Sequence, residues 1–159
     1  MKSSKSFTTT WCVSALFAVT SGIASARQPD VCKAKEGRER PAVDYQVQGG
    51  LTGGLTNWLI YSDGVVCELS GRTTLNERGR IPKDKVTDLV DELGRMGFFA
   101  LAEGHGCRGS ICIQCKSYRV TLRSGTHKHT VQACDEVAKT PQVADILFKI
   151  QQVIAREIQ

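Results

Sequence analysis

The chain has 159 residues, seven cysteines and a formal net charge of +5, with 41% hydrophobic and 23% charged residues. This length corresponds to one small domain. Lysine and arginine are interspersed with aspartate and glutamate rather than gathered in a basic stripe, which argues against a nucleic-acid-binding protein.

The amino-terminal segment has the three parts of an export signal. Lys2 and Lys5 provide a basic start, an apolar stretch covers Trp11–Val19, and Ala24–Ala26 forms a small-residue cleavage site. The apolar stretch is shorter than the roughly 20 residues that a membrane span requires. We therefore predict a signal peptide over residues 1–26, no membrane span, and a secreted or periplasmic protein.

Residues 27–43 are predicted to form a flexible polar leader, because Lys33–Arg40 mixes charges without an apolar period. Residues 44–159 are predicted to form a single α+β domain. Loss of the signal peptide removes Cys12 and leaves an even number of cysteines in an oxidising compartment. We expect these cysteines to staple the domain through disulfides: Cys32, Cys67, Cys107, Cys112, Cys115 and Cys134.

Two apolar segments, Leu55–Tyr61 and Val65–Ser70, are separated by Ser-Asp-Gly and predict a β-hairpin. An Asp-Gly turn supplies the positive φ angles of a tight two-residue turn. In that register Cys67 lies opposite Ile60 and shares a face with Trp58. We therefore expect Cys67 to point into the core with Trp58.

A helix is predicted after Ile81-Pro82, because proline is tolerated at the first helical position. Its apolar residues recur at the spacing of one buried stripe, formed by Val86, Leu89, Val90 and Leu93. Gly94 or Gly97 is expected to end the helix. Phe98 and Phe99 follow directly, and we expect both to fill the core beneath the helix rather than to stack on a ligand.

Lys116–Arg123 and Thr126–Cys134 predict a second hairpin around Ser124-Gly125. Its first strand alternates between a core face, with Tyr118, Val120 and Leu122, and a wet face, with Ser117, Arg119, Thr121 and Arg123. Thr140-Pro141 then begins a closing helix, whose apolar stripe consists of Val143, Ile146, Leu147, Ile150, Val153 and Ile154.

The order hairpin, helix, hairpin, helix predicts an α+β fold. We expect an antiparallel sheet made of the two hairpins, with two helices packed on one of its faces.

The cysteines also permit other chemistry. Cys107, Cys112 and Cys115 have the C-x4-C-x2-C spacing of the two-iron site in plant-type ferredoxins, with Cys134 as a fourth cysteine. The CxxC at the end of this run is a thiol-redox motif, and His105 or Cys134 would complete a four-ligand zinc site. We favour structural disulfides, with no cofactor and no metal, because export leaves a preassembled cluster behind and a strand, not a helix, follows the CxxC.

Spacing alone does not determine the connectivity, since six cysteines allow 15 pairings. A turn at Ser124-Gly125 would bring Cys115 opposite Cys134 with α-carbons about 5.5 Å apart, within the bridging range. A bulge or a different partner stays open. The other four cysteines could pair as Cys32–Cys67 and Cys107–Cys112.

No residue set has the pattern of an active site. His127 and His129 share a strand face but lack a third ligand, so we interpret them as partly exposed hairpin residues. The sequence contains no nucleophile elbow, HExxH helix or phosphate-binding loop. We therefore predict no catalytic residue.

Several short motifs together resemble the emfourin, or protealysin-inhibitor-like, family of small bacterial proteins. They are Gly49-Gly50-Leu51-Thr52-Gly53, Asp63-Gly64, the helix Val86–Leu93 and Gly97–Leu101 (GFFAL). The resemblance extends from about Tyr45 to Ile158 and also includes a related uncharacterised family of bacterial exported domains. These motifs mark turns and the ends of elements in a fold, and they are not catalytic.

Emfourin inhibits thermolysin-like metalloproteases, so the resemblance implies a non-catalytic protein-binding module with a secreted protease as its partner. Only Gly49, Gly50 and Gly53 carry over as candidates for a loop that contacts this partner, since glycines permit close approach. The alternative is that they shape the entry into the first strand. Thr52 stands where a small apolar residue is expected, and the cysteines are additional to the pattern, which leaves room for a different partner.

The sequence thus predicts a secreted or periplasmic protein-binding module, with metalloprotease inhibition as its specific activity. The alternative is a thiol-redox or metal protein that uses Cys107, Cys112 and Cys115.

Overall fold

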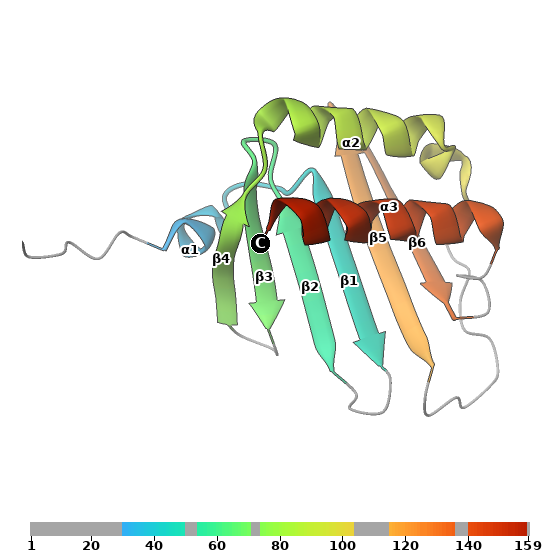
Figure 1. Ribbon diagram of the computed structural model, residues 1–159, viewed down its shortest axis with the longest axis horizontal. Coiled ribbons are helices and arrows are strands. Elements are labelled where there is room, and N and C mark those ends of the chain that lie inside the picture. The colour runs from blue at the N-terminus through green and yellow to red at the C-terminus, as the bar shows by residue number, and fades with distance from the viewer. Residues whose placement is uncertain (1–29, 50–53, 71–73, 104–114, 136–139, 159) are drawn as a thin grey trace, which may run out of the picture.

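A single antiparallel sheet organises the computed structural model, which describes residues 30–49, 54–70, 74–103, 115–135 and 140–158. Within these residues the strands are β1 (Val43–Gly49), β2 (Leu55–Ile60), β3 (Val65–Ser70), β4 (Thr74–Arg80), β5 (Lys116–Ser124) and β6 (His127–Cys134). Their order across the sheet is β4-β3-β2-β1-β5-β6 (Figure 1). The helices are α1 (Val31–Lys35), α2 (Lys83–Arg95), the short 3-10 helix η1 (Phe98–Ala100) and α3 (Pro141–Glu157).

The predicted α+β class is confirmed, whereas the predicted count of elements was wrong. The described sheet contains β1 and β4 in addition to the two hairpins, and α1 is an additional helix. β1 pairs with β2 on one side and with β5 on the other, so it joins the two hairpins into one sheet. β4 has the polar sequence TLNERGR and lies at an edge, where it pairs with β3 alone.

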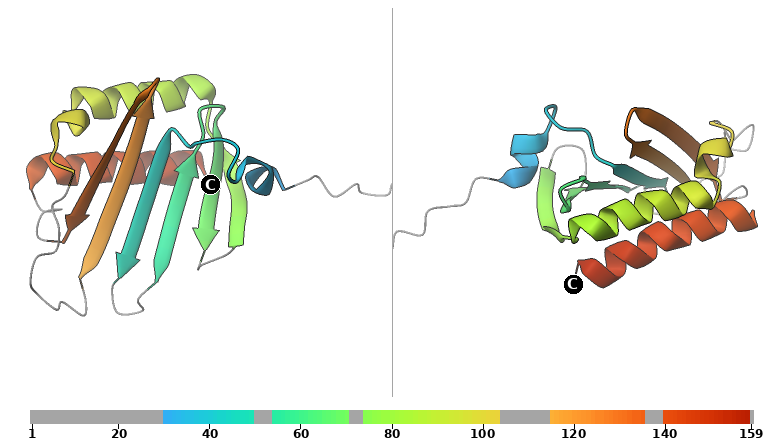
Figure 2. Two further views of the ribbon diagram at one scale, coloured as in Figure 1. Left: turned by 180° about the vertical axis from the view of Figure 1, so that it is seen from behind. Right: turned by 90° about the horizontal axis from the view of Figure 1, so that it is seen from above.

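α2 and α3 lie side by side on one face of the sheet, as predicted (Figure 2). The predicted stripe of α2 is buried at Val86, Leu89, Val90 and Leu93. In α3, Val143, Ile146, Leu147 and Ile150 are buried, and Val153 and Ile154 are partly buried against the same core. Gly97 has a φ of +87°, the left-handed conformation that ends a helix, and leads directly into η1.

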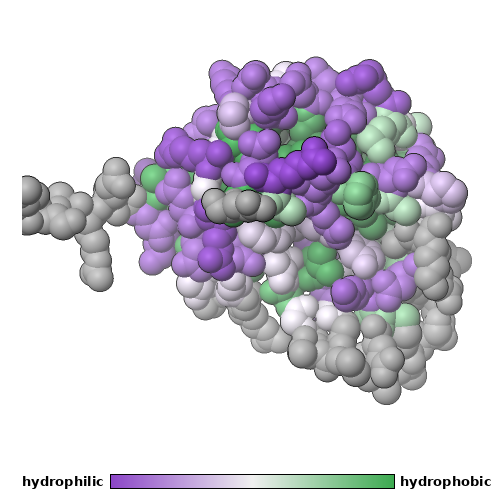
Figure 3. All heavy atoms as spheres, in the orientation of Figure 1, coloured by the Kyte–Doolittle hydropathy of each residue, from purple (hydrophilic) through white to green (hydrophobic). Residues whose placement is uncertain are grey.

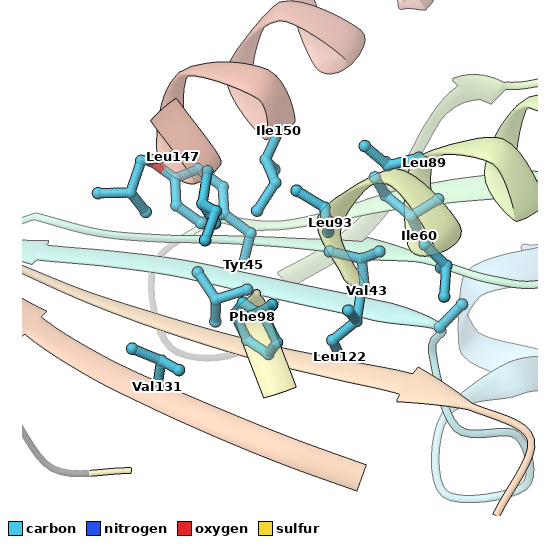
Figure 4. Close-up of a cluster of buried hydrophobic side chains, with 14 of the residues drawn as sticks. Val43, Tyr45, Ile60, Leu89, Leu93, Phe98, Leu122, Val131, Leu147 and Ile150 are labelled. Atoms are coloured by element: carbon cyan, nitrogen blue, oxygen red, sulfur yellow. The ribbon is translucent and has the colours of Figure 1, made fainter. Parts of the chain in front are cut away.

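Alternate residues of the strands complete this core. Val43, Tyr45, Ile60, Leu122 and Val131 point from four strands toward the two helices, and Phe98 enters from η1 (Figure 4). Val120 and Leu122 are buried as the alternation in β5 predicted. Period-2 strands and helices of period 3.6 therefore bury their apolar residues in one common layer.

The first hairpin has a register one residue away from the predicted one. Tyr61 N–H donates to the Val65 carbonyl at 2.9 Å, so the loop contains three residues, and Gly64 takes a φ of +91°. This is the three-residue hairpin loop that ends in a left-handed glycine. Cys67 consequently lies opposite Leu59 rather than Ile60.

A one-residue slip exchanges the two faces of a strand. Cys67 is fully buried as predicted, but the prediction that it shares the core with Trp58 was therefore wrong. Trp58 packs against the helix-side core, whereas Cys67 belongs to a smaller cluster on the other side of the sheet. That cluster consists of Cys32, Tyr61, Val65, Cys67 and Leu75.

The second hairpin also differs from its predicted register. Ser124 lies opposite His127, so the two loop residues are Gly125 and Thr126, and Gly125 has a φ of +57°. The pairing of the whole hairpin follows from this turn, and Ser117 lies opposite Cys134.

Part of the predicted polar leader is ordered against the sheet. Asp30 accepts a hydrogen bond from Lys33 N–H at 3.5 Å and begins α1. Cys32 is fully buried and forms a disulfide with Cys67, with α-carbons 5.9 Å apart, which confirms this pairing. The leader is therefore attached to β3 through α1.

Lys35 provides a second attachment for α1. Its side chain is 8% exposed, and Nζ lies 2.6 Å from a Glu39 carboxylate oxygen and 2.8 Å from an Asp63 carboxylate oxygen. It also lies 5.0 Å from the centre of the Tyr61 ring. Burial by itself lowers the pKa of Lys35, but the hydrogen bonds and charges of Asp63 and Glu39 outweigh this effect and raise it. The ammonium therefore stays charged where it is buried.

None of the described helices is both long enough and apolar enough to cross a bilayer.

Candidate binding surface

The predicted cysteine cluster lies only partly within the described residues. Cys107 and Cys112 fall outside them, as does the predicted Cys107–Cys112 pair. Cys115 and Cys134 are both disulfide-bonded. The register that was to bring these two cysteines together is wrong, since Ser117 lies opposite Cys134, so the geometric reason for a Cys115–Cys134 pair is lost.

His127 and His129 occupy β6 as predicted, with His127 exposed and His129 half-buried. His129 Nε2 lies 2.8 Å from the Leu101 carbonyl oxygen, and its Nδ1 lies 3.7 Å from a Glu103 carboxylate oxygen. In the part of the chain that the structure describes, no three histidine, cysteine or acidic side chains converge as around a metal ion. His129 instead connects β6 to the segment after η1.

The two phenylalanines after α2 have different environments. Phe98 is fully buried, but Phe99 is 36% exposed, so the prediction that both fill the core holds for Phe98 alone. Phe99 lies beside an open hollow of about 410 Å³ that is also lined by Val90, Asp91, Gly94, Arg95 and Ser124. One carboxylate and one guanidinium offset each other in this lining, so the hollow has no charge preference for a ligand.

Of the three glycines proposed to contact a partner, only Gly49 is described. Gly50 and Gly53 fall outside the described residues. Gly49 has a φ of +108°, and a Cβ atom there would collide with the Cys115 carbonyl oxygen. The conformation of β1 and its close approach to the chain before β5 therefore already require glycine at this position.

The face of the sheet opposite α2 and α3 is the most distinctive surface of the molecule. No described helix covers its centre, and α1 lies at the β3–β4 margin (Figure 2). Alternation along the strands places on this face the residues between those of the helix-side core. We call it the open face, and its central residues are Asp44, Gln46, Asn57, Arg119, Thr121, Arg123, Lys128 and Thr130.

Three cations of the open face form what we call the cationic strip, consisting of Arg119, Arg123 and Lys128. Arg119 and Lys128 are exposed and Arg123 is half-buried. Arg123 and Lys128 lie directly opposite each other on β5 and β6. None of the three has a carboxylate within 4.0 Å among the described residues, although other cations of the same part of the chain do.

Asp44 is the acidic residue beside this strip. It lies between Leu59 of β2 and Thr121 of β5, and its carboxylate is hydrogen-bonded by the Asn57 side chain. Burial raises the pKa of Asp44, and the Asn57 hydrogen bond with the charges of Arg123, Arg119 and Lys128 opposes this effect without cancelling it. A single half-buried carboxylate therefore faces three cations.

Two buried polar atoms of the open face have no hydrogen-bond partner among the described residues. They are Asn57 Oδ1 and Arg123 Nη1, an acceptor and a donor on either side of Asp44. Buried polar atoms are ordinarily paired, and an unpaired one calls for an explanation. Both atoms belong to the same surface as the cationic strip.

Three leucines surround Asn57 on the β2–β3 side of the open face. Leu55, Leu59 and Leu69 are half-buried and form what we call the leucine strip. Leu59 and Leu69 also pack against the cluster around Cys32 and Cys67. Neighbouring strands lie about 4.8 Å apart, so the leucine strip lies about 10–14 Å from the β5 end of the cationic strip.

The sequence reveals only part of this surface. Alternation in the second hairpin placed Ser117, Arg119, Thr121 and Arg123 on a wet face. The structure places all four on the open face, but Thr121 is buried there. Asp44 and Asn57 were not recognised, because β1 was not predicted and its partners are distant in the chain. A period-2 signal is present in Val43, Tyr45 and Val47 and could have identified β1.

Comparison with protein-family models and with curated proteins finds no match for this chain.

Proposed function

We propose that the chain is a non-catalytic protein-binding module that acts outside the cytoplasm and binds its partner through the open face. The observation that carries this proposal is the cationic strip. Like charges directly opposite each other on neighbouring strands are destabilising. Arg123 of β5 and Lys128 of β6 are such a pair. A destabilising arrangement of this kind is expected at a binding surface, where function outweighs its cost in stability.

Two further observations support action outside the cytoplasm. Residues 1–26 have the pattern of an export signal, and the Cys32–Cys67 disulfide joins the amino-terminal segment to the sheet. Disulfides persist in secreted and periplasmic proteins and are rare in the cytosol.

Site-specific crosslinking tests the binding surface. A photoreactive phenylalanine replaces Gln132, which is exposed on the open-face side of β6 opposite Arg119, and in a matched variant it replaces the exposed Lys85 of α2. In the cells that export the protein, we expect a protein adduct from position 132 and none from position 85. Adducts from position 85 alone, or from neither position, would reject the open face as the binding surface.

The specific activity that we propose is inhibition of a thermolysin-like metalloprotease, on the basis of the family resemblance. Purified protein beginning at Arg27 is added at micromolar concentration to thermolysin, and hydrolysis of a peptide substrate is followed. We expect the rate to fall. An unchanged rate across secreted metalloproteases would reject inhibition while leaving the crosslinking result standing.

The competing function is thiol-redox or metal chemistry at Cys107, Cys112 and Cys115. The disulfide-bonded state of Cys115 and Cys134 argues against a metal site, because a disulfide sulfur offers no thiolate to a metal, whereas a thiol-redox pair passes through the same oxidised state. Intact mass after alkylation, with and without reductant, separates the two functions. Alkylation only after reduction agrees with structural disulfides, whereas free thiols or retained metal would support the competing function.

A further inference from the structure

We infer that the open face binds an acidic, extended segment of a protein partner, with carboxylates on the cationic strip and apolar side chains on the leucine strip. This inference rests on the proposed function and adds the chemistry of the partner.

Charge complementarity identifies the first half of the segment. Arg119, Arg123 and Lys128 supply three positive charges, and the nearest carboxylate, that of Asp44, is already hydrogen-bonded by Asn57. Arginine presents a planar fork of donors that matches a carboxylate, and charge-assisted hydrogen bonds are the stronger kind. Carboxylates from a partner would separate Arg123 from Lys128 and reduce their mutual repulsion.

The two unpaired polar atoms support binding at this place. Arg123 Nη1 is a buried donor, and Asn57 Oδ1 is a buried acceptor. Both atoms are inaccessible to solvent, so they would pair with a carboxylate oxygen and a backbone N–H of a peptide once the two side chains turn outward. A peptide supplies both kinds of group, whereas a simple anion supplies only acceptors.

The leucine strip identifies the second half of the segment. Leu55, Leu59 and Leu69 are only partly buried, so each leaves apolar surface on the open face. A segment that crosses the strands needs about 10–14 Å to pass from β5 to β2 or β3, which an extended chain covers in about three to four residues. The expected partner sequence therefore has glutamate or aspartate followed three to four residues later by a large apolar residue.

A designed peptide tests the inference. The probe is a short fluorescein-labelled peptide with two glutamates, a serine-glycine spacer of that length and two leucines. Its matched controls have glutamine in place of glutamate, or serine in place of leucine. Fluorescence anisotropy with the mature, oxidised protein should show binding of the probe that weakens from low salt to about 0.15 M salt, and weaker binding of both controls.

Two protein variants locate the binding. The double variant Arg119→Gln/Arg123→Gln should raise the Kd of the probe about tenfold, since each charge-assisted contact contributes part of a 1.4 kcal/mol loss. The matched variant Lys83→Gln/Lys85→Gln removes the same charge from exposed positions of α2 and should leave the Kd unchanged. Amide chemical-shift changes in the unmodified protein should map to β1, β5 and β6, which keeps the test independent of how the variants fold.

Four results would overturn the inference, of which the first three concern the probe. They are equal binding of the glutamine control, equal weakening by the α2 variant, or shift changes confined to α2 and α3. Heparin binding that exceeds probe binding, with no effect of the leucines, would assign the strip to a polyanion and also overturn it. If the module binds a partner of other chemistry, the crosslink at position 132 would still form in each of these cases. Failure of the acidic-segment inference is therefore distinct from failure of the proposed function.

Discussion

The two faces of the sheet are built from the same strands but perform different tasks. On the covered face, alternate residues meet α2 and α3 in a continuous apolar layer (Figure 4). On the open face, the intervening residues form a polar centre with three cations that lack ion-pair partners among the described residues. The covered face therefore holds the larger apolar core, and the open face is the surface that we propose for binding.

The outer surface of the helices sharpens this contrast. Seen from the helix side, the molecule is mostly hydrophilic with separated hydrophobic residues (Figure 3). Phe148 of α3 is such a residue, with 64% exposure. Single exposed apolar residues are ordinary for a folded protein. The helix side thus has neither the charge imbalance nor the leucine strip that distinguishes the open face.

The largest expected effect concerns the covered face. Leu93→Ala removes a fully buried side chain of α2 and should lower the free energy of unfolding by about 2–5 kcal/mol, because it leaves a cavity. Phe148→Ala, at an exposed position, should change it by no more than about 0.5 kcal/mol. Urea denaturation followed by Trp58 fluorescence measures both. Similar losses for the two variants would contradict the assignment of stability to the covered face.

The next effect concerns the margin of the open face where α1 is attached. Replacing Cys32 and Cys67 together with alanine should cost about 2–4 kcal/mol, because the disulfide restricts the unfolded chain. Limited proteolysis should then cut between α1 and β1 sooner than in the unmodified protein. Unchanged stability and unchanged proteolysis would mean that the contacts of Lys35 hold α1 without the disulfide.

A smaller, pH-dependent effect is expected at Asp63. Burial alone would raise the pKa of Asp63, but Lys35 and the Val65 N–H lower it below its ordinary value of 3.8. A lowered pKa in the folded state stabilises the protein above 3.8, and this contribution is lost as the pH falls below that value. Asp63→Asn should therefore cost about 1 kcal/mol or less at neutral pH, because the carboxylate is 48% exposed, and less near pH 2.

Denaturation of Asp63→Asn and the unmodified protein at both pH values provides the comparison. A stability difference that stays constant with pH would show that the Lys35–Asp63 ion pair contributes nothing at this margin.

The smallest expected effect is at Asp44, in the centre of the open face. Its dependence on pH is opposite in sign to that of Asp63. Burial raises the pKa of Asp44 above 3.8 despite Asn57 and the cationic strip. A raised pKa means that the folded state binds the proton more tightly, so stability falls as the pH rises through the folded-state pKa. Asp44→Asn should therefore gain stability relative to the unmodified protein between acid and neutral pH, within about 0.5 kcal/mol. A relative loss over this interval, measured by urea denaturation, would contradict the raised pKa.

Local patterns predicted much of the covered face. The helical stripes of α2 and α3 appear in the sequence as apolar residues three and four positions apart, and the structure buries all of them except Val153 and Ile154, which are partly buried. The Cys32–Cys67 pair was one of the predicted disulfides. The register of the first hairpin was missed by one residue and that of the second by two, since each turn begins one position away from where Asp-Gly and Ser-Gly suggested.

The sequence by itself determined the fold class, the two amphipathic helices, the two hairpins and the polar character of Arg119 and Arg123, because these depend on residues within one or two turns of each other. Only the tertiary structure decided the position of β1 between β2 and β5, and with it the meeting of Asp44, Asn57 and the cationic strip. The physical reason is that strand order and register depend on pairing between residues far apart in the chain, and a shift of one residue moves every side chain of a strand to the other face.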